Sequence, residues 1–304
     1  MRSTLLPSDL TAAEFDALAP DDARWRPAAG ELFSRHGHHG EPRRLGGTAL
    51  VYALGGAVLK LLPPVWAASC DAEVAVLERV HGRLGVPSPE LLAVGSLEGW
   101  RYFLARELQG RALDAVWPSF DCAARERASR QAGELLARLH AVPPPEHPQL
   151  TPPGGWRAFL TANARGAVDL QRARGLGGTD LAWLEAALPT LLPAALRVCD
   201  KTPALLHTEL GPGHLLARED GSLCGVLDFG DALVGPPDYD LVAAGLFVAR
   251  GDPSLFRALA EASGCAVDRE ALLALTALHR YAHLPWYLRE TGIASVEALA
   301  GVFM

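Results

Sequence analysis

The chain has 304 residues, of which 49% are hydrophobic and 21% charged, and its net charge is −7 at pH 7. These values are typical of a globular protein that buries a core in one large or two modest domains. The negative charge and the lack of any basic run argue against nucleic acid and anionic membrane surfaces as partners.

The first 109 residues predict one lobe, with a helical extension over 1–41 and a sheet plus one helix over 42–109. Two apolar strands meet at Gly55-Gly56, which is a hairpin signal. The following helix repeats its apolar residues on one face. The expected elements are helices over 10–35, strands over 42–62, a helix over 69–84, and strands over 90–96 and 100–108.

Residues 110–304 predict a second, mainly helical lobe. The fold class is therefore α+β, with a small antiparallel sheet in one lobe and helices in the other. The expected helices cover 120–142, 154–173, 180–198, 238–251, 253–264, 269–290 and 295–303.

The stretch 205–240, LLHTELGPGHLLAREDGSLCGVLDFGDALVGPPDYD, carries the strongest functional signal. It is close to the kinase pattern H-x-D-x-x-x-x-N followed by D-F-G. His207 and Asp228 match that pattern, whereas Glu209 stands at the Asp position and His214 at the Asn position. Such a site orients an attacking hydroxyl with one group and holds Mg²⁺ against nucleotide phosphates with two others. The alternative interpretation is an ordinary β-hairpin with exposed acids at its turn.

A phosphoryl-transfer site also needs groups that hold the nucleotide. Residues 1–109 are expected to form this nucleotide-binding lobe, and residues 110–304 to hold the catalytic loop and the acceptor site. Gly47 and Thr48 lie between the first two expected strands, where backbone N–H groups can approach a phosphate. Lys60 ends the apolar strand AVLKLL, and Glu73 on the next helix is its expected partner. A strand-end lysine that reaches water is the alternative for Lys60.

The segment YFLARELQG predicts a strand that leads into a linker between the lobes. In a crevice between two lobes, backbone groups can form hydrogen bonds with the adenine base of a bound nucleotide. The groups expected to do so here are the Arg106 carbonyl and the Leu108 amide.

These motifs, in this order, resemble those of the aminoglycoside phosphotransferases, whose fold is like that of protein kinases. The similar segments are VLKLL, DAEVAVLERV, FLARELQG, ELLARLHAVP, LLHTELGPGHLL and GVLDFGDALVGPPDYDLVAAGLF. The C-terminal stretches LFVARGDPSLFRALAEASG, LLALTALHRYAHL and SVEALAGVF are also similar to hygromycin B phosphotransferases of the 7''-type. The resemblance covers roughly residues 25–304.

The resemblance implies a role for each matching position. Glu209 takes the place of the catalytic base, and His207 is a structural residue of the loop. Asp228 holds the Mg²⁺ ions that bridge the ATP phosphates, with His214 as a further metal ligand. Asp240 braces the catalytic loop from the following helix. A glutamate places its carboxylate about 1 Å further out than an aspartate, and an error of that size can cost ~10²-fold in rate.

The acceptor is expected to be a small, polar molecule that carries a hydroxyl group, and a cationic one is compatible with the negative net charge. The resemblance implies an aminoglycoside-type antibiotic such as hygromycin B. Two histidines, His279 and His283, are spaced four apart and are expected on one face of a helix. The candidate acceptor residues are Asp231, Asp238, His279, His283, Trp286, Tyr287 and Glu290.

Two other functions remain open from the sequence. Glu209 and His214 favour a nucleotide-binding pseudokinase with a scaffold or sensor role, and the same site also suits a kinase of a small metabolite. The five scattered cysteines predict free thiols in a reducing cytoplasm. The first residues of the chain contain no apolar segment long enough for a signal peptide, so none is expected. The sequence has no apolar run of 18 residues, so no membrane span is expected either. A monomer or a homodimer is expected.

Overall fold

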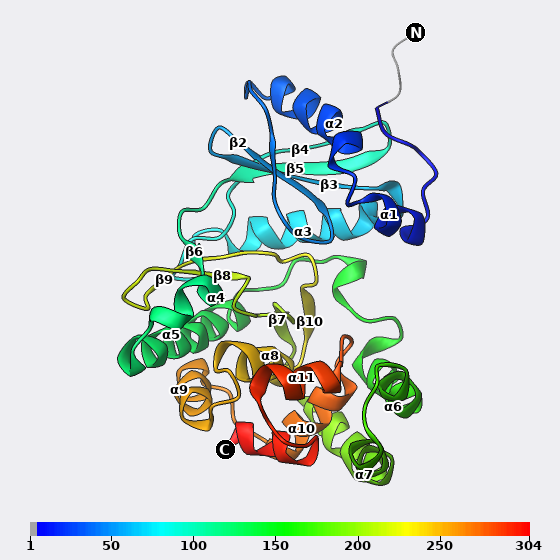
Figure 1. The fold of residues 1–304 in the computed structure, drawn as a ribbon, viewed down its shortest axis with the longest axis vertical. Helices are drawn as coiled ribbons and strands as arrows, with labels where there is room; N and C mark the ends of the chain where they lie inside the picture. Colours follow the sequence, from blue (N-terminus) through cyan, green and yellow to red (C-terminus); the bar gives the residue numbers. More distant parts are fainter. Residues whose placement is uncertain (1–4) are drawn as a thin grey trace.

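A computed structural model describes residues 5–304. A five-stranded antiparallel sheet forms one lobe and helices form most of the other (Figure 1). The strand order is β1-β2-β3-β5-β4, with bounds Arg43–Arg44, Leu50–Leu54, Ala57–Leu62, Leu91–Leu97 and Trp100–Arg106 for β1 to β5. The α+β class with a small antiparallel sheet is confirmed.

The register of this sheet places Lys60 at its centre. Lys60 lies opposite Val51 on β2 and Phe103 on β5. The β2–β3 turn is made by Gly55 and Gly56, whose φ angles of +59° and +77° suit glycine, as the hairpin signal predicted.

Each face of the sheet is covered by helices. The helix α3 (Ala67–Val80) buries Val76 and Leu77 on one side, and α1 (Ala12–Leu18) and α2 (Asp22–Arg35) cover the other. Phe15, Trp25 and Trp100 pack together there, with ring centroids 5.3–6.2 Å apart. The helical extension is confirmed where it is described; residues 1–4 of it lie outside the described residues.

Two short sheets position the loops of the second lobe. The chain crosses over after Arg106, and β6 (Arg111–Ala112) pairs with β8 (Leu215–Ala217), which pairs with β9 (Leu223–Val226). The strand β7 (Ala204–Leu206) pairs with β10 (Leu233–Gly235). Because β7 runs through a loop to β8, and β9 through a loop to β10, the segments 207–214 and 227–232 are brought side by side.

The helices of the second lobe pack below these loops (Figure 1). Among them, the helices Cys122–His140 (α5) and Pro253–Ser263 (α9) pack against each other most extensively. Their bounds are α4 Leu113–Val116, α5 Cys122–His140, α6 Gly155–Ala173, α7 Gly178–Arg197, α8 Asp238–Ala243, α9 Pro253–Ser263, α10 Arg269–Leu278 and α11 Leu284–Thr291.

Three expected helices differ from the structure. The segment 269–290 is not one helix, because α10 ends at Leu278, the next residue His279 has an extended ψ of 148°, and α11 begins only after His283. Pro285, at the first turn of α11, lacks the N–H that a continuous helix would need. After α8 the chain forms a π-helix, Ala244–Val248, and the C-terminal helix Glu297–Phe303 is 3₁₀.

One stretch has the length and composition of a membrane-crossing helix, namely Gly178–Asp200, which contains α7. The expectation that the chain has no membrane span stays a prediction, because this stretch meets the criterion by length and composition only. A single such helix is weak evidence for a membrane span, because core helices of soluble proteins meet the same criterion. This one contains two prolines and packs against α6 and α10.

Candidate active site

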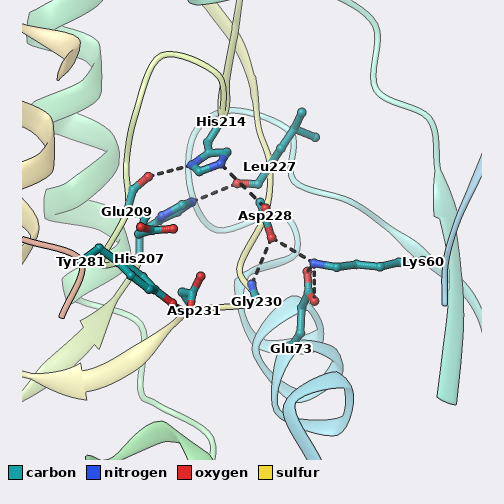
Figure 2. A network of polar contacts seen from close by, with 10 residues as sticks. All are labelled: Lys60, Glu73, His207, Glu209, His214, Leu227, Asp228, Gly230, Asp231 and Tyr281. Atoms are coloured by element: carbon teal, nitrogen blue, oxygen red, sulfur yellow. Dashed lines mark hydrogen bonds and ion pairs between the residues drawn. The ribbon is translucent and has the colours of Figure 1, made fainter. Parts of the chain in front are cut away.

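Lys60 and Glu73 form a buried ion pair, as the sequence predicted. The Lys60 Nζ lies 2.8 Å from Glu73 Oε2, and Glu73 is 4% exposed (Figure 2). Burial acts to lower the pKa of Lys60, but the carboxylates of Glu73 and Asp228 outweigh it and raise that pKa above its ordinary value. The ammonium is therefore fixed and charged at the base of the cleft.

Asp228 joins this pair from the other lobe. Its Oδ1 accepts a hydrogen bond from Lys60 Nζ at 3.0 Å. Burial acts to raise the pKa of Asp228, but Lys60 and the nearby histidines lower it to about 2. Its φ of +61° is unusual for a residue other than glycine, and such strain is concentrated at functional sites.

Gly230 allows this close approach of the two lobes. A Cβ atom at Gly230 would lie 3.1 Å from Lys60 Nζ and 3.3 Å from Glu73 Oε2. A larger residue would thus press on the ion pair, which explains why the residue two positions after Asp228 is glycine.

The backbone of the catalytic loop is held from below by Asp240. This fully buried carboxylate accepts hydrogen bonds from the amides of His207, at 3.1 Å, and Thr208, at 2.6 Å. His140 on α5 contacts the same carboxylate through Nε2, at 2.9 Å. Burial lowers the pKa of His140, but the hydrogen bond to Asp240 and the proximity of Cys265 raise it to about 9. The predicted bracing by Asp240 is confirmed.

His207 is a structural residue, as expected. It is 1% exposed, its Nε2 lies 2.9 Å from the Leu227 carbonyl, and its ring packs on Phe229. Burial lowers the pKa of His207, so the ring is neutral. It ties the catalytic loop to the segment that carries Asp228.

His214 faces Asp228 across the cleft. Its Nδ1 lies 2.7 Å from the Glu209 carbonyl, and its Nε2 lies 3.7 Å from Asp228 Oδ2 (Figure 2). A carbonyl only accepts hydrogen bonds, so Nδ1 carries a proton. The ring also stacks on His207, with centroids 5.6 Å apart.

The Glu209 carboxylate lies next to that of Asp231. Tyr281 OH donates to Asp231 Oδ1 at 2.8 Å, and Arg280 Nη1 lies 3.4 Å from the same oxygen. Burial and the charge of Asp231 raise the pKa of Glu209 to about 7. A carboxylate with this pKa can accept a proton near neutral pH, which suits a general base.

A cavity of about 770 Å³ opens between the lobes over these groups. Gly47 and Thr48 line one side of it, and Lys60 and Asp228 its floor. Leu108 lines it as well, and none of the hydrogen bonds found within residues 5–304 involves its amide. The role of Leu108 and of the Arg106 carbonyl in reading an adenine edge stays a prediction.

A second cavity, of about 360 Å³, adjoins the first, since Gly213, His214 and Tyr281 line both. Glu209 lies on its wall, and aromatic side chains of α11 and the π-helix form much of the rest. The expected acceptor residues that line it are His279, Trp286, Tyr287 and Glu290.

Some expected acceptor residues have other roles. His283 lines neither cavity and caps α11, where its Nδ1 accepts from the Trp286 amide at 3.3 Å. Asp238 is buried in an ion pair with Lys201 at 2.7 Å. His279 is 5% exposed and stacks on Tyr239, with centroids 4.4 Å apart, and burial lowers its pKa to about 4. His279 and His283 do not share a helix face, because α10 ends at Leu278, before both of them, and α11 begins after His283.

Sequence reasoning did not find His140, Thr208 or Tyr281. Thr208 adopts a φ of +69°, and its Oγ1 donates a hydrogen bond to the Asp231 carbonyl at 2.9 Å. No spacing of residues in the sequence predicts this contact. His140 is the last residue of the segment ELLARLH, whose apolar repeat predicts a buried helix face and gives no sign of a functional polar residue at its end. The sequence predicts Tyr281 within a continuous helix over 269–290, whereas it lies in the loop between α10 and α11.

The residues present suit a divalent cation bound together with phosphates. His214 Nε2 and Asp228 Oδ2 face each other, and the other oxygen of Asp228 is occupied by Lys60. Within residues 5–304 no group of three or more His, Cys, Asp and Glu side chains could hold a metal ion alone. A cation here would therefore take its remaining ligands from phosphate or water.

The sequence matches the profile described as the phosphotransferase enzyme family over residues 39–275. This range contains Lys60, Glu73, His207, Asp228 and Asp240. It ends before Tyr281 and α11, which form part of the smaller cavity.

Several solved structures share the fold at low sequence identity. Wild-type aminoglycoside 2'-phosphotransferase-IIIa with GDP has a TM-score of 0.67 and 19% identity, over 93% of this chain and 100% of that one. The streptomycin–ATP ternary complex of APH(2")-IIa has a TM-score of 0.60 and 14% identity, over 90% and 97%. Macrolide 2'-phosphotransferase MphH from Brachybacterium faecium has a TM-score of 0.56 and 20% identity, over 91% and 97%. The kinase-like two-lobed fold is thereby confirmed.

Proposed function

The chain belongs to the phosphotransferase enzyme family and is a small-molecule kinase, and we propose that it transfers the γ-phosphoryl group of ATP to a hydroxyl group of a small polar acceptor. One observation carries this proposal. The Lys60–Glu73–Asp228 cluster lies in the larger cavity, and Glu209 lies on the wall of the smaller cavity that adjoins it.

The two cavities assign separate tasks to the residues of the cleft. Lys60, fixed by Glu73, neutralises charge on the nucleotide phosphates, and the Gly47–Thr48 loop covers them. Asp228 and His214 would hold a divalent cation, which supplies charge neutralisation on the transferred group when it is bound. Catalysis then consists of positioning and electrostatic stabilisation.

Glu209 orients the acceptor. Its carboxylate accepts a hydrogen bond from the reacting hydroxyl, whose oxygen attacks the γ-phosphorus while the bond to the ADP oxygen breaks. The hydroxyl proton passes to Glu209, and a pKa of about 7 suits that role. In a loose transition state the proton leaves late, so the main contribution of Glu209 is to place the oxygen in line.

An aminoglycoside-type antibiotic such as hygromycin B is the proposed acceptor. The smaller cavity brings together the carboxylates of Asp114, Glu209 and Glu290, which suit the amino groups of a cationic sugar. The similar structures include proteins crystallised with streptomycin, gentamicin and kanamycin, and this supports an antibiotic acceptor.

A phosphotransfer screen tests the proposal. Purified protein is incubated with γ-labelled ATP and a panel of aminoglycosides, macrolides, sugars, amino alcohols and nucleosides, and product is separated by chromatography. We expect labelled product with an aminoglycoside, and none with the Asp228→Ala variant. Labelling of a metabolite alone would replace the proposed acceptor. ATP binding without transfer to any acceptor would favour the pseudokinase.

A further inference from the structure

We propose that Arg250 is a specificity-determining residue of the smaller cavity, where its guanidinium binds an oxygen atom of the acceptor and keeps ammonium groups away from that side. The inference rests on the proposed function, because it concerns the acceptor of the same site. It narrows the acceptor to oxygen-rich sugars whose amino groups are few and lie away from Arg250.

The charges on the wall of the smaller cavity are mixed. Within residues 5–304, Arg250 is the only arginine or lysine that lines it, and it shares the wall with the carboxylates of Asp114, Glu209 and Glu290. An arginine in such a wall repels each ammonium group that comes close to it, and repulsion of this kind sets specificity as much as attraction does. A cavity that carries both signs of charge suits an acceptor with amino groups on one part and oxygen atoms on another.

The guanidinium of Arg250 is not used by the protein itself. Its Nε is buried and has no hydrogen-bond partner among the described residues. None of the ion pairs found within residues 5–304 includes Arg250, whereas Arg197 and Arg280 of the same lobe each contact a carboxylate. A guanidinium offers five N–H donors in a planar fork, which matches oxygen atoms of a ligand. These donors are therefore available to the acceptor.

A buried indole holds this guanidinium in place. The Cζ of Arg250 lies 5.4 Å from the ring centroid of Trp117, and the Cζ of Arg125 on α5 lies 5.7 Å from the same ring. The Nε of Arg125 is also buried without a hydrogen-bond partner. Stacking on an aromatic face fixes the plane of an arginine. Two positive charges on one indole also raise the potential around Trp117, which attracts oxygen atoms and repels ammonium groups.

The backbone at Arg250 is strained. Arg250 follows the π-helix Ala244–Val248 and has a φ of +55°, a conformation that costs energy for a residue other than glycine. Strain of this kind and π-helical turns are both concentrated at functional sites. At Gly251 a Cβ atom would lie 3.0 Å from Thr291 Cβ, so the turn packs closely against the end of α11. The strained turn thereby holds Arg250 next to the helix that carries Glu290.

The test measures acceptor binding by calorimetry for the wild type, Arg250→Gln and a control, Arg257→Gln, which replaces an exposed arginine of α9. The probes are pairs of aminoglycosides that differ only in one hydroxyl group replaced by an amino group, with the replacement at a different ring position in each pair. In the wild type, at least one replacement should weaken binding by about tenfold, because a hydrogen bond to a charged group is lost. Arg250→Gln should remove this difference, and Arg257→Gln should keep it.

Two results would overturn the inference and leave the proposed function standing. One is a wild type in which every amino replacement tightens binding, and this result needs no variant to fold. The other is an Arg250→Gln variant that melts as the wild type does and keeps its selectivity, which would mean that Arg250 only packs on Trp117. A wild type that binds none of the compounds would remove the proposed aminoglycoside acceptor, and the inference with it.

Discussion

The two cavities that meet at His214 are built in different ways. The larger one is floored by strand and helix positions, with Lys60 at the centre of a regular ladder and Glu73 on the helix that follows it. The smaller one is formed where regular structure ends, at the break between α10 and α11 and at the π-helix Ala244–Val248.

This difference also separates general from specific recognition. The larger cavity holds paired charges in a fixed frame, which suits a phosphate chain common to many reactions. Several aromatic rings line the irregular wall of the smaller cavity, and the ring centroids of Phe247 and Trp286 lie 4.7 Å apart. If the comparison is right, changes in the larger cavity should abolish the chemistry, and changes in the smaller one should alter acceptor affinity.

The largest effect is expected for Asp228→Ala. It removes the carboxylate that faces both Lys60 and His214, so the rate of transfer should fall by roughly 10³-fold. Because the Asp228 side chain is half exposed, the melting temperature should change little. Initial rates and thermal melts measure both quantities, with Asp220→Ala, an exposed acid in the β8–β9 turn, as control. An unimpaired rate would disprove the assignment of the site.

Glu209→Gln should come next. The amide keeps the size of the side chain but cannot accept the proton, so kcat should fall by ~10²-fold or more. Steady-state kinetics with a saturating acceptor measure this. Glu209→Asp is the informative companion, because a faster reaction in that variant would show that the longer side chain is a handicap. Equal kcat for the wild type and Glu209→Gln would exclude a base role.

Lys60→Ala tests the nucleotide side. Loss of the ammonium should lower kcat/KM for ATP by ~10²-fold, since a positioned positive charge on the phosphates is removed. Nucleotide titration and melting curves measure it, and the loss of activity should exceed the loss of stability. A variant that merely unfolds, with normal nucleotide affinity in its folded fraction, would contradict the role of Lys60.

Trp286→Ala tests the acceptor side and should have a smaller effect. Removal of one aromatic surface should raise KM for the acceptor by about three- to tenfold and leave kcat nearly unchanged. KM for ATP serves as the internal control, and it should stay constant. An equal change in both KM values would mean that the two cavities are not separate subsites.

The smallest effect concerns pH. Because the pKa of Glu209 is raised to about 7, kcat/KM should increase with pH up to about that value, as the carboxylate loses its proton. In Asp231→Asn a neighbouring negative charge is removed, so this rise should move to lower pH.

The raised pKa of Glu209 also means that the folded state binds this proton more tightly than the unfolded state. Its contribution to stability is therefore present at low pH and lost as pH rises toward 7.

Most of the fold and of the nucleotide side could be predicted because they depend on periodic signals. The glycine pair at the β2–β3 turn, the apolar strand around Lys60 and the D-F-G triplet each specify a local structure. The acceptor side could be predicted only in part. His279, Trp286, Tyr287 and Glu290 line the smaller cavity as expected, but the helical pattern of 269–290 continues through residues that leave the helix. No residue before Pro285 predicts the interruption between α10 and α11. Tyr281 lies in that interruption, and from there its hydroxyl reaches Asp231.

The attachment of Asp240 to the catalytic loop has a consequence for the evolution of such sites. Asp240 binds the backbone amides of His207 and Thr208, and not the side chains of the residues that follow. Asp240 therefore holds the backbone at 207 and 208 whichever side chains occupy positions 209 and 214. A lineage can exchange its base or its metal ligand one step at a time and keep a folded loop throughout. A glutamate and a histidine at these positions are then variations that this scaffold tolerates, and they need not be signs of decay.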